Sequence, residues 1–228
     1  MPPSADSSAS SSSSSAPRDR APSRWNGLST EERQRERRQL LIEAAFELLA
    51  TEGTTGTTVR AVCSHARLNP RYFYESFDDL DELVVAVFID VARQLQRRVT
   101  EATATAGDSV ADAVHAAVGA TVRFIDEDRR RGQIIYIESL GNVALNRHRV
   151  TSGQDLIDLV RRDTVRRGGS RGSQQRDHLA AALLVGGFHE MMIAWLTDRV
   201  ELDADELIAH ATELFITAVE AAEDVSLS

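Results

Sequence analysis

Hydrophobic residues recur with a period of about 3.6 along nearly the whole chain, which is the pattern of amphipathic helices. The first such stripe is formed by Leu41, Ala44, Ala45, Leu48 and Leu49. It follows Ser29, Thr30 and two glutamates, a combination that is typical of a helix start. Gly53 stands where a glycine commonly ends a helix, because glycine adopts a left-handed conformation at little cost.

Two short helices and a longer one are predicted next. Thr58 can cap a helix that carries Val59, Val62, Cys63 and Ala66. Asn69 and Pro70 then open another helix, because asparagine is a strong N-cap and proline is pre-set for the first helical position. The acidic residues at 78–82 favour a helix start as well. The helix that follows them carries Leu83, Val84, Val87, Phe88, Val91 and Leu95.

The rest of the chain continues the same pattern. Further helices are predicted at residues 110–125, 133–140, 145–165, 178–197 and 204–222, the third of them less regular, with a loop at 168–173. No run alternates between apolar and polar residues with turn signals at its ends, as a strand would. The predicted fold class is therefore all-α.

The first thirty residues differ in composition from the rest. Residues 10–15 are an unbroken run of serine among prolines and small polar residues, so residues 1–30 are expected to form a disordered tail. This tail lacks the apolar region of a signal peptide, and no apolar run is expected to approach the roughly 20 residues that span a bilayer. With Cys63 as the single cysteine, these features favour a cytoplasmic protein with no membrane partner.

Acidic residues outnumber basic ones, and the net charge is -9. The surplus lies outside the first third of the chain: residues 1–77 carry 10 Arg and 9 Asp or Glu, whereas residues 78–228 carry 16 Arg and 26 Asp or Glu. Charges farther apart than a Debye length of about 8 Å are screened, so a nucleic-acid partner requires a local basic face rather than a basic total. The charge pattern is therefore compatible with DNA binding by the N-terminal part.

Residues 57–77 meet the packing requirements of a helix-turn-helix. Leu68 supplies an apolar plug for the turn, and Phe73 and Phe77, four residues apart, form the buried side of the second helix. The outward side is then formed by Asn69, Arg71, Tyr72 and Glu75, with Tyr74 near its edge.

The stretch TTVRAVCSHARLNPRYFYESF, preceded by LLIEAAFELLATEGTTG and followed by DDLDEL, resembles the TetR family of bacterial repressors. Downstream, RGQIIYIESLGNVAL and LLVGGFHEMMIAWL look more loosely like the effector domain of actinobacterial members. The resemblance implies a three-helix, homeodomain-like DNA-binding domain at 31–96, including the start of a long linking helix, and an effector-binding and dimerisation domain at 97–228. It also implies a ligand-responsive repressor that binds a pseudo-palindromic, double-stranded DNA operator as a homodimer.

Carried over position by position, the resemblance implies contacts to phosphates and base edges. The DNA-binding residues implied in this way are Thr58, Arg60, Asn69, Pro70, Arg71, Tyr72 and Tyr74. Arg71 is expected to read a base directly, because a guanidinium can bind O6 and N7 of guanine together, which discriminates by about 1–3 kcal/mol.

Several positions depart from the family pattern. Arg67 stands where the family has a turn glycine, and Ala61 stands where it has the acidic partner of a capping box. Ser76 replaces an aromatic residue, and Leu80 replaces a lysine that commonly reaches a phosphate. Glu75 points an acid towards DNA, where it either reads a cytosine amine or repels. A basic arm along the DNA could compensate for the lost lysine. This arm would consist of Arg33, Arg35, Arg37 and Arg38, with three more arginines in the tail. The alternative is that these arginines form a solvated helix face.

For the second domain, the resemblance implies a small, apolar effector. The predicted pocket residues are Phe88, Phe124, Tyr136, Glu138, Asn142, Phe188, Met192 and Trp195, with core packing as the alternative for the apolar ones. The glycine pair Gly186-Gly187 costs a helix about 1 kcal/mol per residue, which close approach of another helix would offset. The predicted dimer interface is Leu183, Gly187, Leu214, Phe215 and Ala218.

Other functional classes find little support. No nucleophile motif, phosphate loop or carboxylate cluster is present, so we expect no catalytic site, no metal site and no cofactor. Cys63, on the inner face of a short helix, is interpreted as a small buried residue rather than a redox switch. The alternative that stays open is a regulator that works without a small-molecule ligand, either through a protein partner or constitutively.

Overall fold

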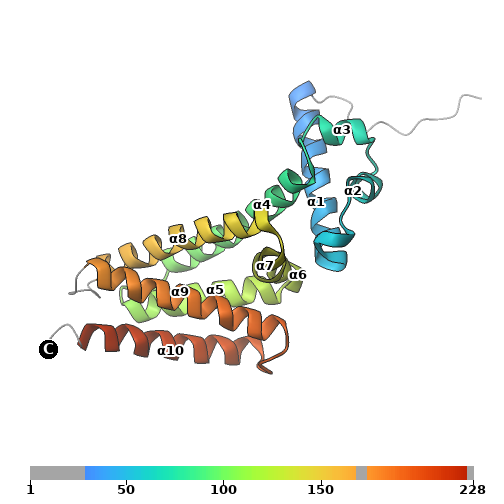
Figure 1. Ribbon diagram of the computed structural model, residues 1–228. Helices are drawn as coiled ribbons and strands as arrows, with labels where there is room; N and C mark the ends of the chain where they lie inside the picture. Colours follow the sequence, from blue (N-terminus) through green and yellow to red (C-terminus); the bar gives the residue numbers. More distant parts are fainter. Residues whose placement is uncertain (1–28, 168–173, 225–228) are drawn as a thin grey trace, which may run out of the picture.

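The computed structural model describes residues 29–167 and 174–224, and these form helices and short connections without a strand (Figure 1). The helices are α1 (Thr30–Gly56), α2 (Val59–Ala66), α3 (Pro70–Tyr74), α4 (Leu80–Ala104), α5 (Val110–Asp126), α6 (Arg129–Gly132), the π-helix η1 (Gln133–Glu138), α7 (Ser139–Gly141), α8 (Val143–Arg166), α9 (Gln174–Leu196) and α10 (Ala204–Asp224). The prediction of an all-α fold is confirmed. The predicted loop at 168–173 and nearly all of the predicted tail lie outside the described residues.

Local chemistry sets the ends of the first three helices. Ser29 and Glu32 form a reciprocal capping box at the start of α1. Gly53 has a φ of 67°, which interrupts α1 where the sequence places a helix-ending glycine. The Thr58 hydroxyl accepts a hydrogen bond from the Ala61 N–H at the start of α2.

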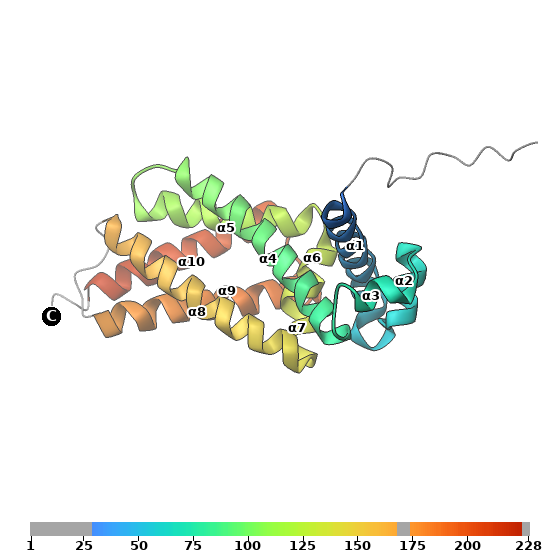
Figure 2. The same cartoon turned by 90° about the horizontal axis from the view of Figure 1, so that it is seen from above.

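Two hydrophobic clusters meet along α4. The first cluster joins α1, α2 and α3 to the N-terminal half of α4 and includes Leu83, Val87 and Phe88. The second cluster contains Val91 and joins α4 to α5, η1, α9 and α10. Figure 2 shows the result, with α1–α3 at one end, an elongated helical body at the other, and α4 running between them. One continuous helix therefore mechanically links the two parts.

The segment between α5 and α8 is more complex than predicted. The sequence predicts one short helix at 133–140, whereas the structure has α6, then a π-helix, then one turn of α7. π-Helices are rare and frequently occur at functional sites. The following helix, α8, runs through Gly153 without interruption, so the irregularity expected there is absent.

Helix α9 is unusually apolar for its exposure. An 18-residue window within it has a mean hydropathy of 1.6, and only 22% of that window is buried. It is therefore long and apolar enough to cross a membrane by length and composition alone, although no uninterrupted apolar run suggested this. A partly exposed apolar helix in a helical bundle equally suits contact with another protein chain.

Candidate nucleic-acid interface

The short helix α3 is fixed by its two predicted buried aromatics. Phe73 is fully buried and Phe77 nearly so, and their ring centroids lie 5.8 Å apart. At its start, the Asn69 side-chain oxygen accepts a hydrogen bond from the Arg71 N–H at 2.9 Å, and Pro70 is the first helical residue. A helix of five residues has little stability of its own. Tertiary packing and this cap therefore determine where its outer face points.

Most of the predicted DNA contacts lie on the surface of α2 and α3. Thr58, Arg60, Asn69, Pro70, Arg71 and Tyr74 are all exposed, as binding to DNA requires. Tyr72 differs, because it is half-buried beneath the guanidinium of Arg37, which lies 4.3 Å from the centre of its ring. This contact comes from α1 and is a cation–π interaction.

Glu75, the residue that ends α3, contacts two arginines. Its Oε1 accepts from Nε of Arg71 at 2.8 Å, and its Oε2 lies 3.8 Å from Nη2 of Arg37. Its backbone oxygen accepts from the Gln34 side-chain amide at 3.3 Å. The acidic side chain that seemed out of place beside DNA is thus part of a charge network between α1 and α3.

The turn between α2 and α3 adopts the conformation for which the family uses glycine. Arg67 has φ 55° and ψ 40°, and its N–H caps α2 through the carbonyls of Cys63 and Ser64. For a residue with a side chain, the left-handed conformation costs roughly 1–2 kcal/mol. Leu68 beside it packs against the first hydrophobic cluster, as the predicted plug should.

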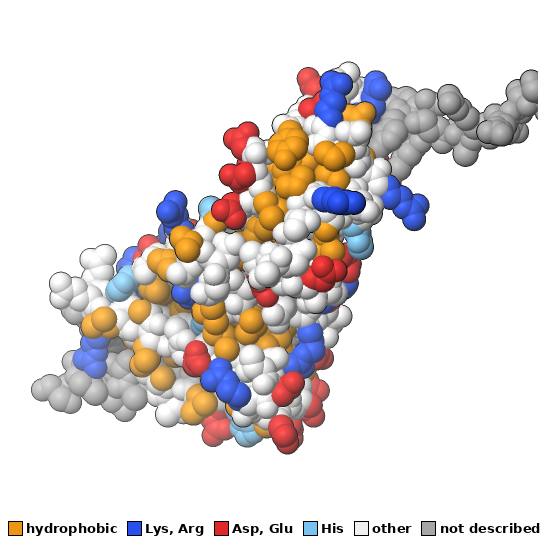
Figure 3. All heavy atoms as spheres, turned by 45° about the vertical axis from the view of Figure 1, so that its right-hand side comes forward, with side chains coloured by type: hydrophobic (Ala, Val, Ile, Leu, Met, Phe, Trp, Pro, Cys, Tyr) orange, Lys and Arg blue, Asp and Glu red, His pale blue; other side chains and the backbone are white. Residues whose placement is uncertain are grey.

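Two of the four α1 arginines predicted to form a basic arm are engaged with aromatic rings. Arg37 covers Tyr72, and the Arg38 guanidinium lies 4.7 Å from the centre of the Phe77 ring. Figure 3 shows basic side chains near the end of the molecule that holds the start of α1, with hydrophobic side chains exposed beside them. Arg37 and Arg38 therefore support the recognition helix rather than forming a free arm.

Comparison with known proteins agrees with this geometry. The model of the bacterial regulatory proteins of the tetR family matches residues 41–87, which extend from α1 into α4. This N-terminal part of the chain is therefore similar to the DNA-binding part of the TetR-family regulators. The match indicates a DNA-binding transcriptional regulator.

Solved structures of similar fold cover nearly the whole described chain. A protein of Syntrophomonas wolfei assigned to the TetR-family transcriptional regulators has a TM-score of 0.70 and 14% identity, covering 82% of this chain and 96% of that one. A protein of Pseudomonas aeruginosa PAO1 assigned as a transcriptional regulator has a TM-score of 0.69 and 21% identity, and the match covers 87% of this chain and 95% of that one. The fatty acid degradation regulator FadR of Bacillus halodurans has a TM-score of 0.66 and 15% identity, and the match covers 78% of this chain and 94% of that one. No curated protein matches the chain.

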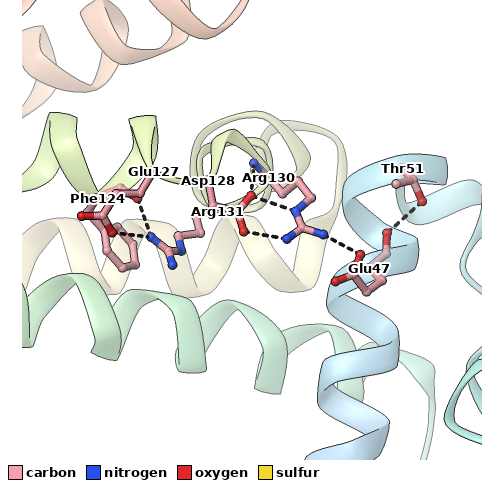
Figure 4. A network of polar contacts seen from close by, with 7 residues as sticks. All are labelled: Glu47, Thr51, Phe124, Glu127, Asp128, Arg130 and Arg131. Atoms are coloured by element: carbon pink, nitrogen blue, oxygen red, sulfur yellow. Dashed lines mark hydrogen bonds and ion pairs between the residues drawn. The ribbon is translucent and has the colours of Figure 1, made fainter. Parts of the chain in front are cut away.

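Within this fold, α6 carries three arginines with three different neighbours, and Figure 4 shows the contacts of Arg130 and Arg131. Arg129 stacks on Trp195 at 4.8 Å and donates to its backbone oxygen. Arg130 binds both carboxylate oxygens of Asp128 at 2.8 Å and donates to Oε2 of Glu47 on α1 at 2.6 Å. Arg131 donates to the backbone oxygen of Phe124 on α5 at 2.7 Å. This short helix therefore ties α1, the DNA-binding part, to the helical body.

A second tie is made by the π-helix. Glu138 at its end accepts hydrogen bonds from the N–H of Thr54 at 3.0 Å and from its hydroxyl at 2.7 Å. Thr54 follows directly on Gly53, so the break in α1 presents both donors to η1. The sequence predicted Glu138 to line the effector pocket, and the structure places it at the contact between the two parts.

The other predicted pocket residues are dispersed. Phe88 belongs to the first hydrophobic cluster, and the Asn142 side chain caps α8. The second cluster contains Phe124, Tyr136, Met192 and Trp195, with Phe188 at its edge. The helical body thus packs five of the eight around one core, which agrees with both a pocket lining and simple core packing.

One polar group beside this cluster lacks a hydrogen-bond partner in the described part of the chain. The ring of His189 lies 4.9 Å from that of Tyr136, and its Nε2 is buried with no hydrogen-bond partner among the described residues. Burial, reinforced by the positive charge of Arg149, lowers the pKa of His189. A buried nitrogen without a hydrogen-bond partner is costly, so this group needs a functional explanation.

The predicted interface residues occupy the outer side of α9 and α10. Leu183 and Leu214 are 70% and 60% exposed, and a side chain added at Gly187 would meet nothing within 4 Å. Phe215 instead packs its ring against Phe188, at 5.7 Å. Ala218 is half-buried. An open groove of about 770 Å³ runs between the two helices, lined mainly by apolar residues that include Gly187 and Leu214.

Sequence reasoning missed the supports of the recognition helix. The spacing of Arg71 and Glu75, four residues apart on a helix, could have indicated an ion pair, but Glu75 was predicted only to face DNA. No neighbouring residue in the sequence indicates that Arg37 and Gln34 contact Glu75, because these contacts arise from the packing of α1 on α3. Among the described residues, no group of His, Cys, Asp and Glu is arranged to hold a metal ion, and burial raises the pKa of Cys63, which disfavours a reactive thiolate.

Proposed function

We propose that this protein is a dimeric, ligand-responsive repressor that reads its operator with the outer face of α3. The observation that carries the proposal is the exposed guanidinium of Arg71, held on a helix whose opposite side is locked by Phe73. In the proposed division of roles, Arg71 and Tyr72 contact base edges. Thr58, Arg60, Asn69, Pro70 and Tyr74 position the protein on phosphates and nearby bases. We place the DNA-binding domain at residues 31–96 and the effector and dimerisation domain at 97–228.

Dimerisation would occur through α9 and α10. Leu183 and Leu214 are 70% and 60% exposed in the single chain, so an interface can bury only about two-thirds of each side chain. A fully buried leucine contributes about 1.5–3 kcal/mol, so the four leucines of two copies would contribute on the order of 4–8 kcal/mol. The contact would also cover the apolar surface of α9 that is exposed in the single chain. Two recognition helices about 34 Å apart would then match a pseudo-palindromic site.

The dimer is tested by sedimentation velocity of the variant Leu183→Glu. This variant should sediment as a monomer, because a charge cannot be buried in an apolar contact without a partner. Val150→Glu, at an exposed apolar position on α8, is the matched control and should stay dimeric. A dimeric Leu183→Glu protein would contradict the proposed interface.

The effector would be a small, largely apolar molecule bound within the second cluster, with a polar atom that meets Nε2 of His189. The fold is shared with a regulator described by its role in fatty acid degradation, so acyl compounds are the first class to test. Binding would favour a conformer that fits the operator less well, which releases repression. Such a protein would act in the cytoplasm, on the nucleoid.

A thermal-shift screen with fatty acids, acyl-CoA thioesters and lipophilic drugs separates this mechanism from the alternative. At least one compound should raise the melting temperature and weaken DNA binding. If no compound does either, the alternative holds, in which the regulator acts through a protein partner or constitutively.

A further inference from the structure

Glu75 stands beside the proposed base-reading residue and has the opposite charge. The two oxygens of its carboxylate have different partners, Nε of Arg71 at 2.8 Å and Nη2 of Arg37 at 3.8 Å. The Glu75 side chain is 34% exposed, whereas that of Arg71 is 81% exposed. The acid therefore lies beneath the arginine and not in front of it.

The atom of Arg71 that Glu75 engages decides what the arginine can still do. Nε is bound, while the side chain has no other hydrogen bond or ion pair within residues 29–167 and 174–224. Both Nη groups are thus free, and they form the pair of parallel donors that matches O6 and N7 of guanine. An arginine without this contact would distribute over many rotamers, several of which reach phosphates instead.

Glu75 is itself held in place from α1. The Gln34 amide donates to its backbone oxygen at 3.3 Å, and Arg37, whose side chain is only 18% exposed, lies between its carboxylate and the Tyr72 ring. A residue that ends a five-residue helix would otherwise fray with it. The contacts from α1 therefore fix the carboxylate that orients Arg71.

We propose that Glu75 is a positioning residue for DNA recognition, which orients the Arg71 guanidinium for bidentate binding of guanine and so sets base preference at the expense of overall affinity. This inference rests on the proposed function, because it requires that α3 reads bases. It replaces both earlier interpretations of Glu75. An acid whose oxygens both face arginines is poorly placed to accept from a cytosine amine, and its charge is offset by those arginines.

The experiment is selection from a random-sequence pool of duplex DNA by the full-length dimer, followed by affinity measurements on the selected duplex and on its guanine-substituted forms. The wild type should select a guanine in each half-site that Arg71→Ala no longer selects. Glu75→Ala should lower the preference for that guanine by about 1.4- to 5-fold, the factor that an exposed i,i+4 ion pair is worth. Its affinity for random duplex DNA should be unchanged or higher, because an acid has been removed.

Two further variants separate positioning from charge and from folding. Glu75→Gln keeps an acceptor for Nε and should retain most of the guanine preference. Asp81→Ala removes a charge of the same sign from an exposed position at the start of α4 and should raise affinity for all sequences equally. In Glu75→Ala, the released Arg71 should also steepen the dependence of log K on log salt by up to about one unit, a change that loss of structure would not produce.

The outcomes are distinct. A wild-type protein that selects no sequence overturns the proposed function and this inference with it. A selected guanine that depends on Arg71 but is preferred equally by Glu75→Ala overturns this inference alone. Loss of a cytosine preference in both Glu75 variants, with the guanine unaffected, would show that Glu75 reads a base directly and would also overturn it.

Discussion

The contact between Glu138 and Thr54 connects η1 of the helical body to α1 of the DNA-binding part, and its removal has a calculable effect. Glu138→Ala deletes the acceptor for two donors of Thr54, its N–H at 3.0 Å and its hydroxyl at 2.7 Å. Both donors lie immediately after the break at Gly53. The substitution should therefore loosen the end of α1 relative to η1.

The expected cost follows from the chemistry of these two bonds. A hydrogen bond to a charged group contributes about 1.5–3 kcal/mol. Because the site is only half-buried, we take that range for the two bonds together. In a domain of this size, 1 kcal/mol shifts the melting temperature by about 2–4 °C, so a decrease of roughly 3–12 °C is expected. Glu138→Gln keeps one acceptor without the charge and should lose about half as much.

Amide hydrogen exchange measures the effect where it arises. The Thr54 amide should exchange about tenfold faster or more in Glu138→Ala, since each 1.4 kcal/mol of lost protection is a factor of ten. Glu52→Ala, an exposed neighbour on the same helix, is the control and should leave this amide unchanged. If Glu138→Ala changes neither the exchange of Thr54 nor the melting temperature by more than this control, the proposed tie is not functional.

Three further predictions concern the turn, helix α6 and the buried histidine. Arg67→Gly should raise the free energy of unfolding by about 0.5–1 kcal/mol in urea titrations, because relief of the left-handed conformation exceeds the added entropy of glycine in the unfolded chain; a destabilised variant would contradict this. Arg130 and Glu47 can be replaced by glutamine singly and together, and the free energies of unfolding then give the coupling energy of their ion pair. This coupling should be about 0.2–1 kcal/mol and should decrease in high salt. Zero coupling at low salt would show that the ion pair does not form. Burial lowers the pKa of His189, so as pH decreases the unfolded chain binds a proton at this histidine before the folded protein does. The free energy of unfolding should therefore fall as pH decreases from about 7.5 through the unfolded pKa of about 6.5. It should level off below the pKa of the folded state. His189→Gln should flatten melting temperature over this range, and an unchanged slope would exclude His189 as its source.

Features set by neighbouring residues could be predicted from the sequence. The caps at Ser29, Thr58 and Asn69 are local, and each forms as its residue type favours. The burial of Phe73 and Phe77 follows from their spacing on one helix. Local physics is therefore enough to locate the helix-turn-helix and to identify which of its faces is exposed.

Features that depend on distant residues could not be predicted in this way. Thr54 and Glu138 are 84 positions apart, and the sequence pattern gives no indication that they meet. The π-helix at Gln133–Glu138 differs from an α-helix only in its hydrogen-bond register, which residue periodicity does not report. For the same reason Glu138 was predicted to lie in a pocket, because a polar residue in an apolar stretch indicates a partner without identifying it.

The reading of DNA by α3 is tested most directly by selection from a random duplex pool with the wild-type protein and with the double variant Arg71→Ala/Tyr72→Ala. The wild type should enrich a pseudo-palindrome whose half-sites lie one helical turn apart, and the variant should remain dimeric, bind duplex DNA weakly and enrich no sequence. Enrichment of the same pseudo-palindrome by the double variant would contradict the assignment of the recognition face.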